Sequence, residues 1–216
     1  MKVLVVGASR GSGAGAVQEL AKAGHLVTAF ARSVAPEPNS EDVRHVAGDV
    51  MDPDSLGKAM VGQDAVVVAL GISDNPIAVR LLRRASTPLD VRSRGTAQVV
   101  DAMRAAGVRR LVVQSTYGIG ETYASLPLSL KIFFSLVIRP QVKDHVRQEE
   151  LVRRSGLDWT PVRPVVLHDD ATDAPAKVDL EDGVESLKVS RNQLAHVLAE
   201  AVGREDWHGQ TLSVSG

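Results

Sequence analysis

The chain has 216 residues, with 25 Lys and Arg against 26 Asp and Glu, for a formal net charge of −1. Hydrophobic residues make up 44% and charged residues 24%, which is the balance of a soluble globular protein. The near-zero charge argues against a general nucleic-acid-binding protein, because a positive excess is needed to neutralise phosphates. The absence of cysteine excludes disulfides, thiolate metal sites and cysteine nucleophiles, and the six histidines lack the spacing of zinc ligands, so no metal site is predicted.

Neither a targeting segment nor a membrane span is expected from the apolar runs. The run that follows Lys2 ends at Gly7 and is too short for the core of a signal peptide. The longest later run, residues 126–138, contains Lys131 and falls short of the roughly 20 residues that cross a bilayer. We therefore expect a cytoplasmic protein with no membrane and no nucleic-acid partner, which acts on a small-molecule substrate as a monomer or a homodimer.

Short β-branched runs alternate with helical periods along the first two thirds of the chain. Most runs are too uniformly apolar to have a solvent-exposed face, which is typical of a parallel sheet covered on both sides. This alternation predicts an α/β fold, a doubly wound and mostly parallel Rossmann-type sheet with right-handed crossovers. Asp90 offers a side chain to cap the third helix. Strands are predicted at residues 3–6, 26–31, 43–47, 65–70 and 111–114, and helices at 14–23, 55–60, 89–106 and 142–155.

The C-terminal third follows a different pattern, with shorter elements and an acidic segment. No internal repeat or low-complexity linker separates it from the rest of the chain. We expect residues 1–216 to form one domain, in which residues from about 158 to 216 contribute the substrate side. The predicted order is a strand at 158–163, an irregular acidic segment at 169–183, a short strand at 187–189, a helix at 192–202 and a last strand at 211–214.

The strongest chemical signal is a glycine-rich loop between the first predicted strand and the first predicted helix. Its glycines let the chain turn tightly and let a pyrophosphate approach the backbone, while the helix N-terminus supplies free N–H groups. The alternative is a mere tight turn, but the strand before the loop and the helix after it indicate dinucleotide binding. The loop residues assigned to the cofactor are Gly7, Ser9, Arg10, Gly11, Ser12 and Gly13.

Arginine side chains favour NADPH over NADH as that dinucleotide. A site that prefers NAD carries Asp or Glu at the end of the second strand, where it holds the ribose 2′-hydroxyl. This chain has Arg32 and Ser33 there, and Arg10 in the loop adds a second guanidinium that can face a 2′-phosphate. Hydrogen bonds to charged groups contribute roughly 1.5–3 kcal/mol each, so two arginines would favour NADPH about a hundredfold or more. The alternative is that both arginines are solvated surface residues.

Further motifs follow the glycine loop in a fixed order. Singly they are weak, but the order is specific, and the most diagnostic are QEEL at 148–151 and SGLDWT at 155–160. With them the chain resembles, essentially from end to end, the atypical short-chain dehydrogenases. Within these it resembles the NmrA-like or NAD(P)H-binding group that includes flavin and biliverdin-IXβ reductases. The other motifs are found at residues 48–50, 62–67, 69–71, 106–112 and 162–164.

The resemblance implies roles for residues at the ends of the strands. Asp49 and Val50 would contact adenine. Ser115 and Thr116, at the end of the fifth strand, would stand beside the nicotinamide, in agreement with the general position of ligands in open α/β sheets. For this pair the alternative is two hydroxyls that close a strand end. The resemblance also places with the cofactor Ala69, Leu70, Gly71 and Pro164.

The chain departs from the family pattern at two places. Many short-chain dehydrogenases use a Tyr-x-x-x-Lys pair, in which the lysine lowers the tyrosine pKa. Lys143 occupies the expected lysine position, but Arg139 stands where the tyrosine is expected, which puts the alcohol-dehydrogenase mechanism in doubt. The glycine loop carries Ser9 and Arg10 instead of the Gly-Ala-Thr-Gly form, and so looks more like the loop of NADP-dependent short-chain reductases.

Four side chains are candidates for proton donation or substrate positioning. Tyr117 follows the hydroxyl pair, although strand alternation can turn it away, and Tyr123 can fold over the site. His168 lies on the loop after the sixth strand and titrates near neutral pH, while Lys143 can reach the nicotinamide ribose from its helix. The alternatives are a surface histidine and a solvated helix lysine.

Residues 126–138 carry two of the three phenylalanines of the chain directly after the fifth strand. This segment is interpreted as an apolar lid over a flat substrate or as a dimer contact. The alternative is a core helix that packs under the sheet.

The leading interpretation is an NADPH-dependent oxidoreductase that transfers a hydride to a small, flat, conjugated acceptor such as a flavin, a quinone or a related carbonyl compound. Such acceptors need positioning more than acid–base chemistry, which would explain the missing tyrosine. One alternative is a non-catalytic NADP(H)-binding redox sensor of the NmrA type. A further alternative is an epimerase or dehydratase with a tightly held cofactor.

Overall fold

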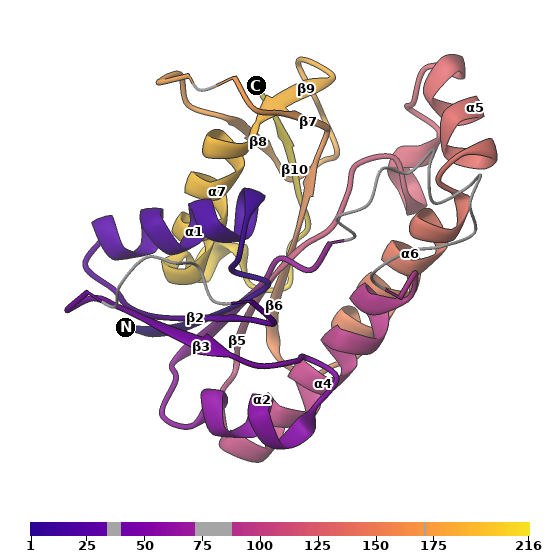
Figure 1. Ribbon diagram of the computed structural model, residues 1–216. Helices are drawn as coiled ribbons and strands as arrows, with labels where there is room; N and C mark the ends of the chain where they lie inside the picture. Colours follow the sequence, from indigo (N-terminus) through magenta and orange to yellow (C-terminus); the bar gives the residue numbers. More distant parts are fainter. Residues whose placement is uncertain (34–39, 72–87, 171) are drawn as a thin grey trace.

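An eight-stranded sheet lies at the centre of the computed structural model, which describes residues 1–33, 40–71, 88–170 and 172–216. The strand order is β3-β2-β1-β4-β5-β6-β10-β8 (Figure 1). All pairings in this sheet are parallel except that of β8 with β10, and β7 pairs in parallel with β9 outside it. The strands are β1 (Lys2–Val6), β2 (Leu26–Ala31), β3 (Val43–Ala47), β4 (Ala65–Val68), β5 (Arg110–Gln114), β6 (Asp158–Pro164), β7 (Val166–His168), β8 (Lys177–Asp179), β9 (Lys188–Ser190) and β10 (Leu212–Ser215).

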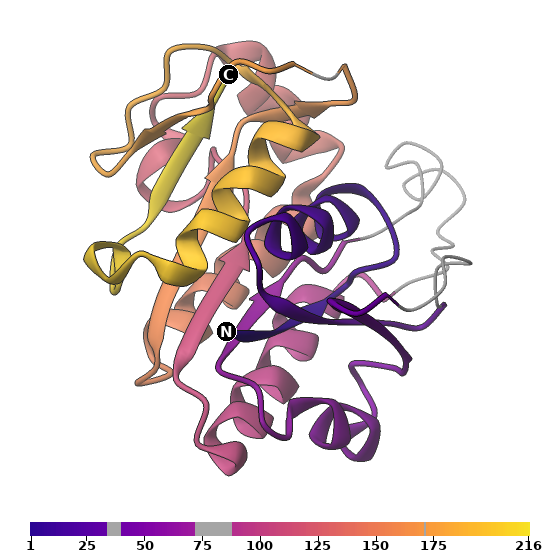
Figure 2. The same cartoon turned by 90° about the vertical axis from the view of Figure 1, so that its left-hand side faces the viewer.

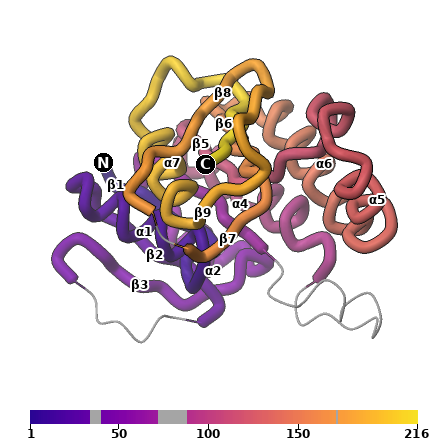
Figure 3. The backbone as a smooth tube through the Cα atoms, turned by 90° about the horizontal axis from the view of Figure 1, so that it is seen from above, coloured from indigo at the N-terminus to yellow at the C-terminus, as the bar shows by residue number. Residues whose placement is uncertain are grey.

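Helices cover both faces of the sheet, so the predicted doubly wound α/β fold is confirmed. α1 and α7 pack side by side on one face, and α2, α4 and α6 lie on the other (Figures 1 and 2). α5 packs against α6 at the side of the molecule opposite β3 (Figure 3). None of the helices in the described parts of the chain has the length and apolar character needed to cross a membrane. The helices are α1 (Gly11–Lys22), α2 (Pro53–Met60), α4 (Val91–Ala106), α5 (Leu128–Leu136), α6 (Arg139–Arg153) and α7 (Arg191–Gly203), with short 3-10 turns η1 (Gly120–Tyr123) and η2 (Glu205–Trp207).

Burial on both faces explains why the strands are uniformly apolar. In β1, Val3 and Val5 join the core formed with α1 and α7, whereas Leu4 and Val6 join the core formed with α2, α4 and α6. All four side chains are at most 1% exposed. Since burying a Val or Leu side chain contributes about 1.5–3 kcal/mol, this alternation fixes the strand between its two helical layers.

The contact between α1 and α7 is unusually close at one point. A Cβ atom on Gly15 of α1 would lie 2.7 Å from the Cβ atom of Ala195 in α7, a distance that real Cβ atoms do not adopt. Glycine opposite alanine therefore lets the helix that follows the glycine loop rest directly on the last long helix of the chain.

Several predicted boundaries differ from the observed ones for identifiable reasons. α1 begins at Gly11, three residues earlier than predicted, so part of the glycine loop forms its first turn. α6 begins at Arg139, because Pro140 is tolerated in a first turn whose N–H groups have no partner within the helix. The acidic segment predicted to be irregular contains β8, an antiparallel strand of three residues at the sheet edge.

The predicted cap of α4 is wrong. Asp90 precedes the helix, but its side chain makes no capping hydrogen bond. The cap comes instead from Asp144 of α6, which accepts from the backbone N–H groups of Arg92 at 3.0 Å and Ser93 at 3.1 Å. A carboxylate that is 52 residues away in sequence from Arg92 thus holds the first turn of α4 against α6.

Candidate functional site

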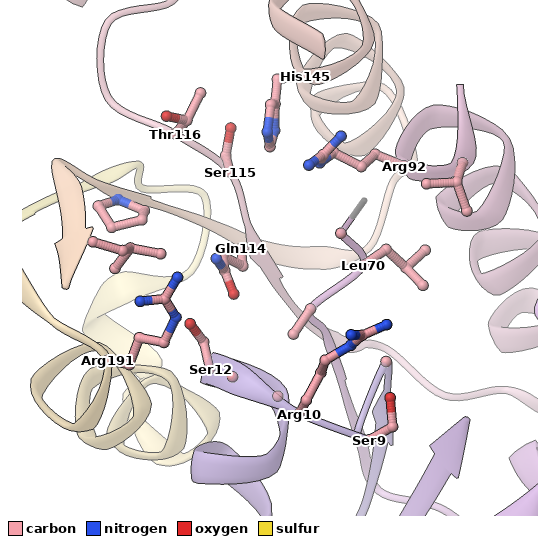
Figure 4. A pocket seen from close by; sticks show the side chains of 18 of the residues that line it. Ser9, Arg10, Ser12, Leu70, Arg92, Gln114, Ser115, Thr116, His145 and Arg191 are labelled. Atoms are coloured by element: carbon pink, nitrogen blue, oxygen red, sulfur yellow. The ribbon is translucent and has the colours of Figure 1, made fainter. Parts of the chain in front are cut away.

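A cavity of about 840 Å³ lies beyond the carboxyl ends of β1, β4 and β5. This is the end of a parallel sheet at which open α/β folds bind ligands. The glycine loop and the end of β2 line one end of the cavity, and the residues after β5 together with α5 and α6 line the other. Figure 4 shows polar side chains from several of these elements pointing into it.

The glycine loop is packed so closely that two of its positions exclude any side chain. Gly7 has a φ of +92°, and a Cβ atom there would lie 2.5 Å from the carbonyl oxygen of Ala69 at the end of β4. A Cβ atom on Gly13 would lie 2.2 Å from the carbonyl oxygen of Gly7. The loop therefore needs glycine both for its backbone conformation and for its approach to β4.

The first turn of α1 has no capping side chain. Arg10 occupies the N-cap position in an extended conformation without a side-chain hydrogen bond to the helix, and the first turn contains no acidic residue. The N–H groups of Gly11, Ser12 and Gly13 have no acceptor within the helix, and the helix dipole adds partial positive charge. The narrow glycine cradle and these donors together fit the pyrophosphate of a dinucleotide.

All predicted cofactor residues except Lys143 line the cavity. The adenosine end is formed by the loop, the residues after β2 and the residues after β3. There Asp49 accepts a hydrogen bond from the N–H of Met51 at 2.9 Å, which shapes its turn. The cavity-lining residues among those predicted are Gly7, Ser9, Arg10, Gly11, Ser12, Gly13, Arg32, Ser33, Asp49, Val50, Ala69, Leu70, Gly71, Ser115 and Pro164.

The hydroxyl residues after β5 also lie in the cavity wall, but with different hydrogen-bonding states. Ser115 is 2% exposed, and its Oγ has no hydrogen-bond partner among the described residues. Thr116 donates to the carbonyl oxygen of Tyr117 at 3.2 Å, and the Tyr117 hydroxyl donates to the carbonyl oxygen of Asp182 at 3.3 Å. Ser115 is therefore the hydroxyl of this group that is available to a ligand.

A buried arginine holds the loop that follows β5. Arg163 of β6 is 2% exposed and makes two hydrogen bonds to Glu149 of α6, at 2.9 and 2.7 Å. It also contacts Glu121 at 3.0 Å and Asp182 at 3.4 Å. Burial lowers the pKa of Arg163, but Glu149 and Glu121 outweigh this and raise it above its ordinary value. This cluster joins β6, α6, η1 and the segment before β9.

Three predicted candidates do not line the cavity. Lys143 is exposed on α6 and does not line the cavity, so its contact with the nicotinamide ribose stays a prediction. The His168 ring lies 3.5 Å from exposed Asp170. Tyr123 is 40% exposed and lies beneath the ammonium group of Lys131. For Lys143, the alternative of a solvated helix lysine describes the structure.

Five polar residues of the described cavity wall were missed from the sequence, namely Arg92, Gln114, His145, Asp169 and Arg191. Arg191 pairs with Asp169 at 3.0 Å, and its Nε would lie 3.7 Å from a Cβ atom on Gly11, so it leans against the glycine loop. His145 is two residues from Lys143, and helical periodicity puts the two side chains on different sides of α6. No local motif marks Arg92 or His145.

Arg92, His145 and Ser115 line the end of the cavity away from the glycine loop (Figure 4). Burial lowers the pKa of Arg92 below its ordinary value, and Asp144 opposes this. Burial and the Arg92 guanidinium hold the pKa of His145 well below its usual range, against a small opposing effect of Gln148. The imidazole is therefore neutral at neutral pH, and its buried Nδ1 has no hydrogen-bond partner among the described residues.

Apolar side chains line the end of the cavity that is formed by the residues after β5 together with α5 and α6. α5 and its flanks contribute the inward-facing side chains, of which Phe134 is 9% exposed. The opposite side of α5 is exposed, with Leu128 at 74%, Ile132 at 50% and Leu136 at 63%. One face of this segment therefore packs on the hydrophobic core and lines the cavity while the other is exposed, and a dimer contact stays a prediction. The apolar residues of the segment that line the cavity are Leu126, Leu130, Phe133, Phe134 and Ile138.

A family model described as NAD(P)H-binding matches residues 7–205, from the glycine loop to η2. The chain belongs to the NAD(P)H-binding family. An uncharacterised chloroplastic protein of Arabidopsis thaliana is 28% identical over 212 residues, which cover 95% of this chain and 73% of that protein. A 3-diazoavenalumate denitrifying reductase of Streptomyces sp is 36% identical over 120 residues, which cover 53% of this chain and 38% of the reductase. The chain thus matches well under half of the length of that reductase.

Solved structures show the same fold as this member of the NAD(P)H-binding family. An oxidoreductase of Lactococcus lactis superposes with a TM-score of 0.82 at 19% identity, covering 100% of this chain and 91% of that chain. A short-chain dehydrogenase/reductase of Veillonella parvula, solved with NADP, gives 0.79 at 18% identity, covering 100% and 94%. The predicted resemblance to the NAD(P)H-binding group is confirmed by the family match, and these structures show the same fold.

Proposed function

We propose that this chain is an NADPH-dependent oxidoreductase that transfers a hydride to a small, flat, conjugated acceptor such as a flavin, a quinone or a related carbonyl compound. The observation that carries the proposal is the single cavity that joins the glycine loop to an apolar chamber beyond β5. The loop end offers donors for a pyrophosphate, and the chamber offers an apolar wall against which a flat acceptor can pack.

The chain contributes binding and orientation more than covalent chemistry. When bound, reduced nicotinamide supplies two electrons and a hydrogen as hydride, and the reduced acceptor takes up one proton from solvent to balance the reaction. The N–H groups of the first turn of α1 hold the pyrophosphate in place. The unpartnered Ser115 hydroxyl can donate to the nicotinamide carboxamide or to an acceptor oxygen. The apolar side of α5 excludes water from the acceptor.

The preference for NADPH rests on the arginines at the adenosine end. Arg10 and Arg32 both line the cavity there, beside Ser33, and no acidic residue stands at the end of β2. A 2′-phosphate between two guanidinium groups would gain charge-assisted hydrogen bonds that a 2′-hydroxyl cannot make.

The test of the cofactor preference is calorimetric titration of Arg32→Asp with NADPH and with NADH. We expect the NADPH affinity to fall by about tenfold or more, because a hydrogen bond to a charged group is lost and a carboxylate is placed beside the phosphate. The NADH affinity should change little. The matched control is Arg44→Asp, which makes the same charge change at an exposed residue of β3 outside the cavity lining. Equal weakening of NADPH and NADH by Arg32→Asp would refute the role of this residue.

A non-catalytic NADP(H) sensor is the second candidate function. It is favoured by Arg139, which stands where the catalytic tyrosine of short-chain dehydrogenases is expected, and by the Tyr117 hydroxyl, which is engaged with a backbone carbonyl. NADPH consumption with FMN and with menadione separates the two functions. Turnover with either acceptor supports the reductase, whereas tight NADPH binding without any turnover supports the sensor.

A further inference from the structure

Arg92 presents a buried and incompletely paired cation to the acceptor end of the cavity. Its side chain is 12% exposed, and its Nε and Nη1 atoms are buried without a hydrogen-bond partner among the described residues. Figure 4 shows the guanidinium pointing into the cavity from the first turn of α4. An arginine keeps its charge at neutral pH and offers five N–H donors, so burial in this state is costly unless a ligand completes its contacts.

The nearest carboxylate does not satisfy this cation. Asp144 lies 3.9 Å from Nη1, beyond hydrogen-bond distance. Its oxygens already accept from the Arg92 and Ser93 backbone N–H groups at 3.0 and 3.1 Å, and from the Ser93 hydroxyl at 2.5 Å. The charge of Asp144 is thus committed to the N-terminus of α4, and the guanidinium receives only a weak electrostatic contact.

No other acidic group on the described wall of the cavity pairs with Arg92. The two carboxylates among the described lining residues are Asp49 and Asp169. Asp49 shapes the turn at the adenosine end, and Asp169 pairs with Arg191 at 3.0 Å. His145, which lies beside Arg92, is neutral and adds no negative charge. The acceptor end therefore combines one unmatched positive charge with an apolar wall.

We propose that Arg92 binds a carboxylate on the acceptor, so that the substrate class is a flat, conjugated, apolar molecule that carries an acidic substituent. The apolar residues of α5 contact the flat body, and the buried Ser115 hydroxyl lies across from the cation near the reacting part. This inference rests on the proposed function, because it describes the acceptor of that reaction. It makes Arg92 a specificity-determining residue that discriminates acidic acceptors from neutral ones of the same shape.

The test compares two ligands of the same shape, 2-naphthoate and 2-naphthamide, by calorimetric titration into the protein saturated with NADP⁺. We expect the wild-type protein to bind the naphthoate about tenfold or more tightly than the naphthamide, since a buried charged hydrogen bond separates them. Arg92→Met should abolish this preference and leave the naphthamide affinity unchanged. The matched control is Arg94→Met on the same helix, whose side chain is 63% exposed and pairs with Asp90, and which should keep the preference.

Three results overturn the carboxylate site. They are equal wild-type affinity for the two ligands (including no binding of either), an unchanged preference in Arg92→Met, and a loss of NADP⁺ affinity in Arg92→Met with the preference intact. The last would assign the cation to the cofactor. The titration needs no turnover, so it separates this inference from the proposed function. A protein that reduces menadione without a naphthoate preference loses only the carboxylate site, whereas one with the preference but no reductase activity loses only the reductase.

Discussion

Arg163 and Arg92, two arginines whose side chains are 2% and 12% exposed, have opposite surroundings. Arg163 in β6 is bound by Glu149 and touches two further carboxylates, and its pKa is raised. Arg92 in α4 has one carboxylate at 3.9 Å, and its pKa is lowered. The same side chain is thus neutralised within the protein at one place and left unmatched at another, 71 residues apart in a single chain.

The difference separates a structural charge from one available to a ligand. Arg163 connects four elements beneath the loop that carries Ser115, so its contacts are complete before any ligand arrives. Arg92 faces the cavity, where a ligand can supply the contacts that the protein does not. Incomplete pairing of a buried charge in a cavity is a physical sign of function, whereas complete pairing is a sign of architecture.

Replacement of Arg163 is expected to have the largest effect on stability. Arg163→Met leaves Glu149, which is 4% exposed, with Arg153 at 3.6 Å as its one cationic partner among the residues that the structure describes. We expect the free energy of unfolding to fall by about 3–5 kcal/mol, which urea denaturation measures. The control is Arg109→Met, whose pair with Asp158 is exposed to solvent and should contribute much less to stability than the Arg163 pair. A loss of stability for Arg163→Met as small as that for Arg109→Met would show that Arg163 is not the structural charge described above.

A second prediction concerns the pH dependence of stability at the Arg92 end. The folded protein holds the His145 pKa below its ordinary value of about 6.5, so as the pH falls below that value the unfolded chain takes up a proton that the folded chain excludes. Stability should therefore decrease with acid, by at most about 1.4 kcal/mol per pH unit for this one group.

Urea denaturation between pH 7 and pH 5 measures this contribution. His145→Gln should flatten the dependence, and Arg92→Met should weaken it, because the repelling cation is gone. Superimposable pH profiles for the wild-type protein and His145→Gln would show that the imidazole takes up its proton equally well in the folded state.

The smallest expected effect is that of Arg92→Met on the stability of the free protein. Asp144 keeps its three donors from the first turn of α4 after this change, so no new buried charge loses its hydrogen bonds. We expect the free energy of unfolding at neutral pH to stay within about 1 kcal/mol of the wild-type value. A loss as large as that of Arg163→Met would make Arg92 an architectural residue like its counterpart.

The cofactor end of the cavity could be predicted because its signals are local. The residues from Gly7 to Gly13 join the end of β1 to the first turn of α1, and Arg32 follows directly after β2. Adjacent positions in sequence carry the turn, the backbone donors and the cation. The mostly parallel sheet and both helical layers followed from the same alternation, whereas α1, α2 and α6 begin two or three residues before their predicted starts, where glycine or proline lowers helix propensity.

The acceptor end could not be predicted because it is assembled from distant segments. Arg92 and His145 come from two helices, α4 and α6, that only the folded chain brings together. The same packing lets Asp144 of α6 cap α4 in place of Asp90. Lys143 was chosen from its position in a family motif, although its helical face points elsewhere. Which face of α6 meets the cavity depends on how α6 packs against α4, and a motif does not encode that packing.

Folding during synthesis is constrained by the contact of Gly15 with Ala195. The helix that follows the glycine loop is among the first to leave the ribosome, yet the helix on which it rests is among the last. One edge of β6 likewise has no pairing strand until β10 has been synthesised, because β10 pairs along that edge. The part of α1 that contacts α7 stays uncovered until residues near 203 have emerged, and long-range contacts of this kind form slowly. Nascent chains arrested before α7 should therefore be the species most dependent on chaperones.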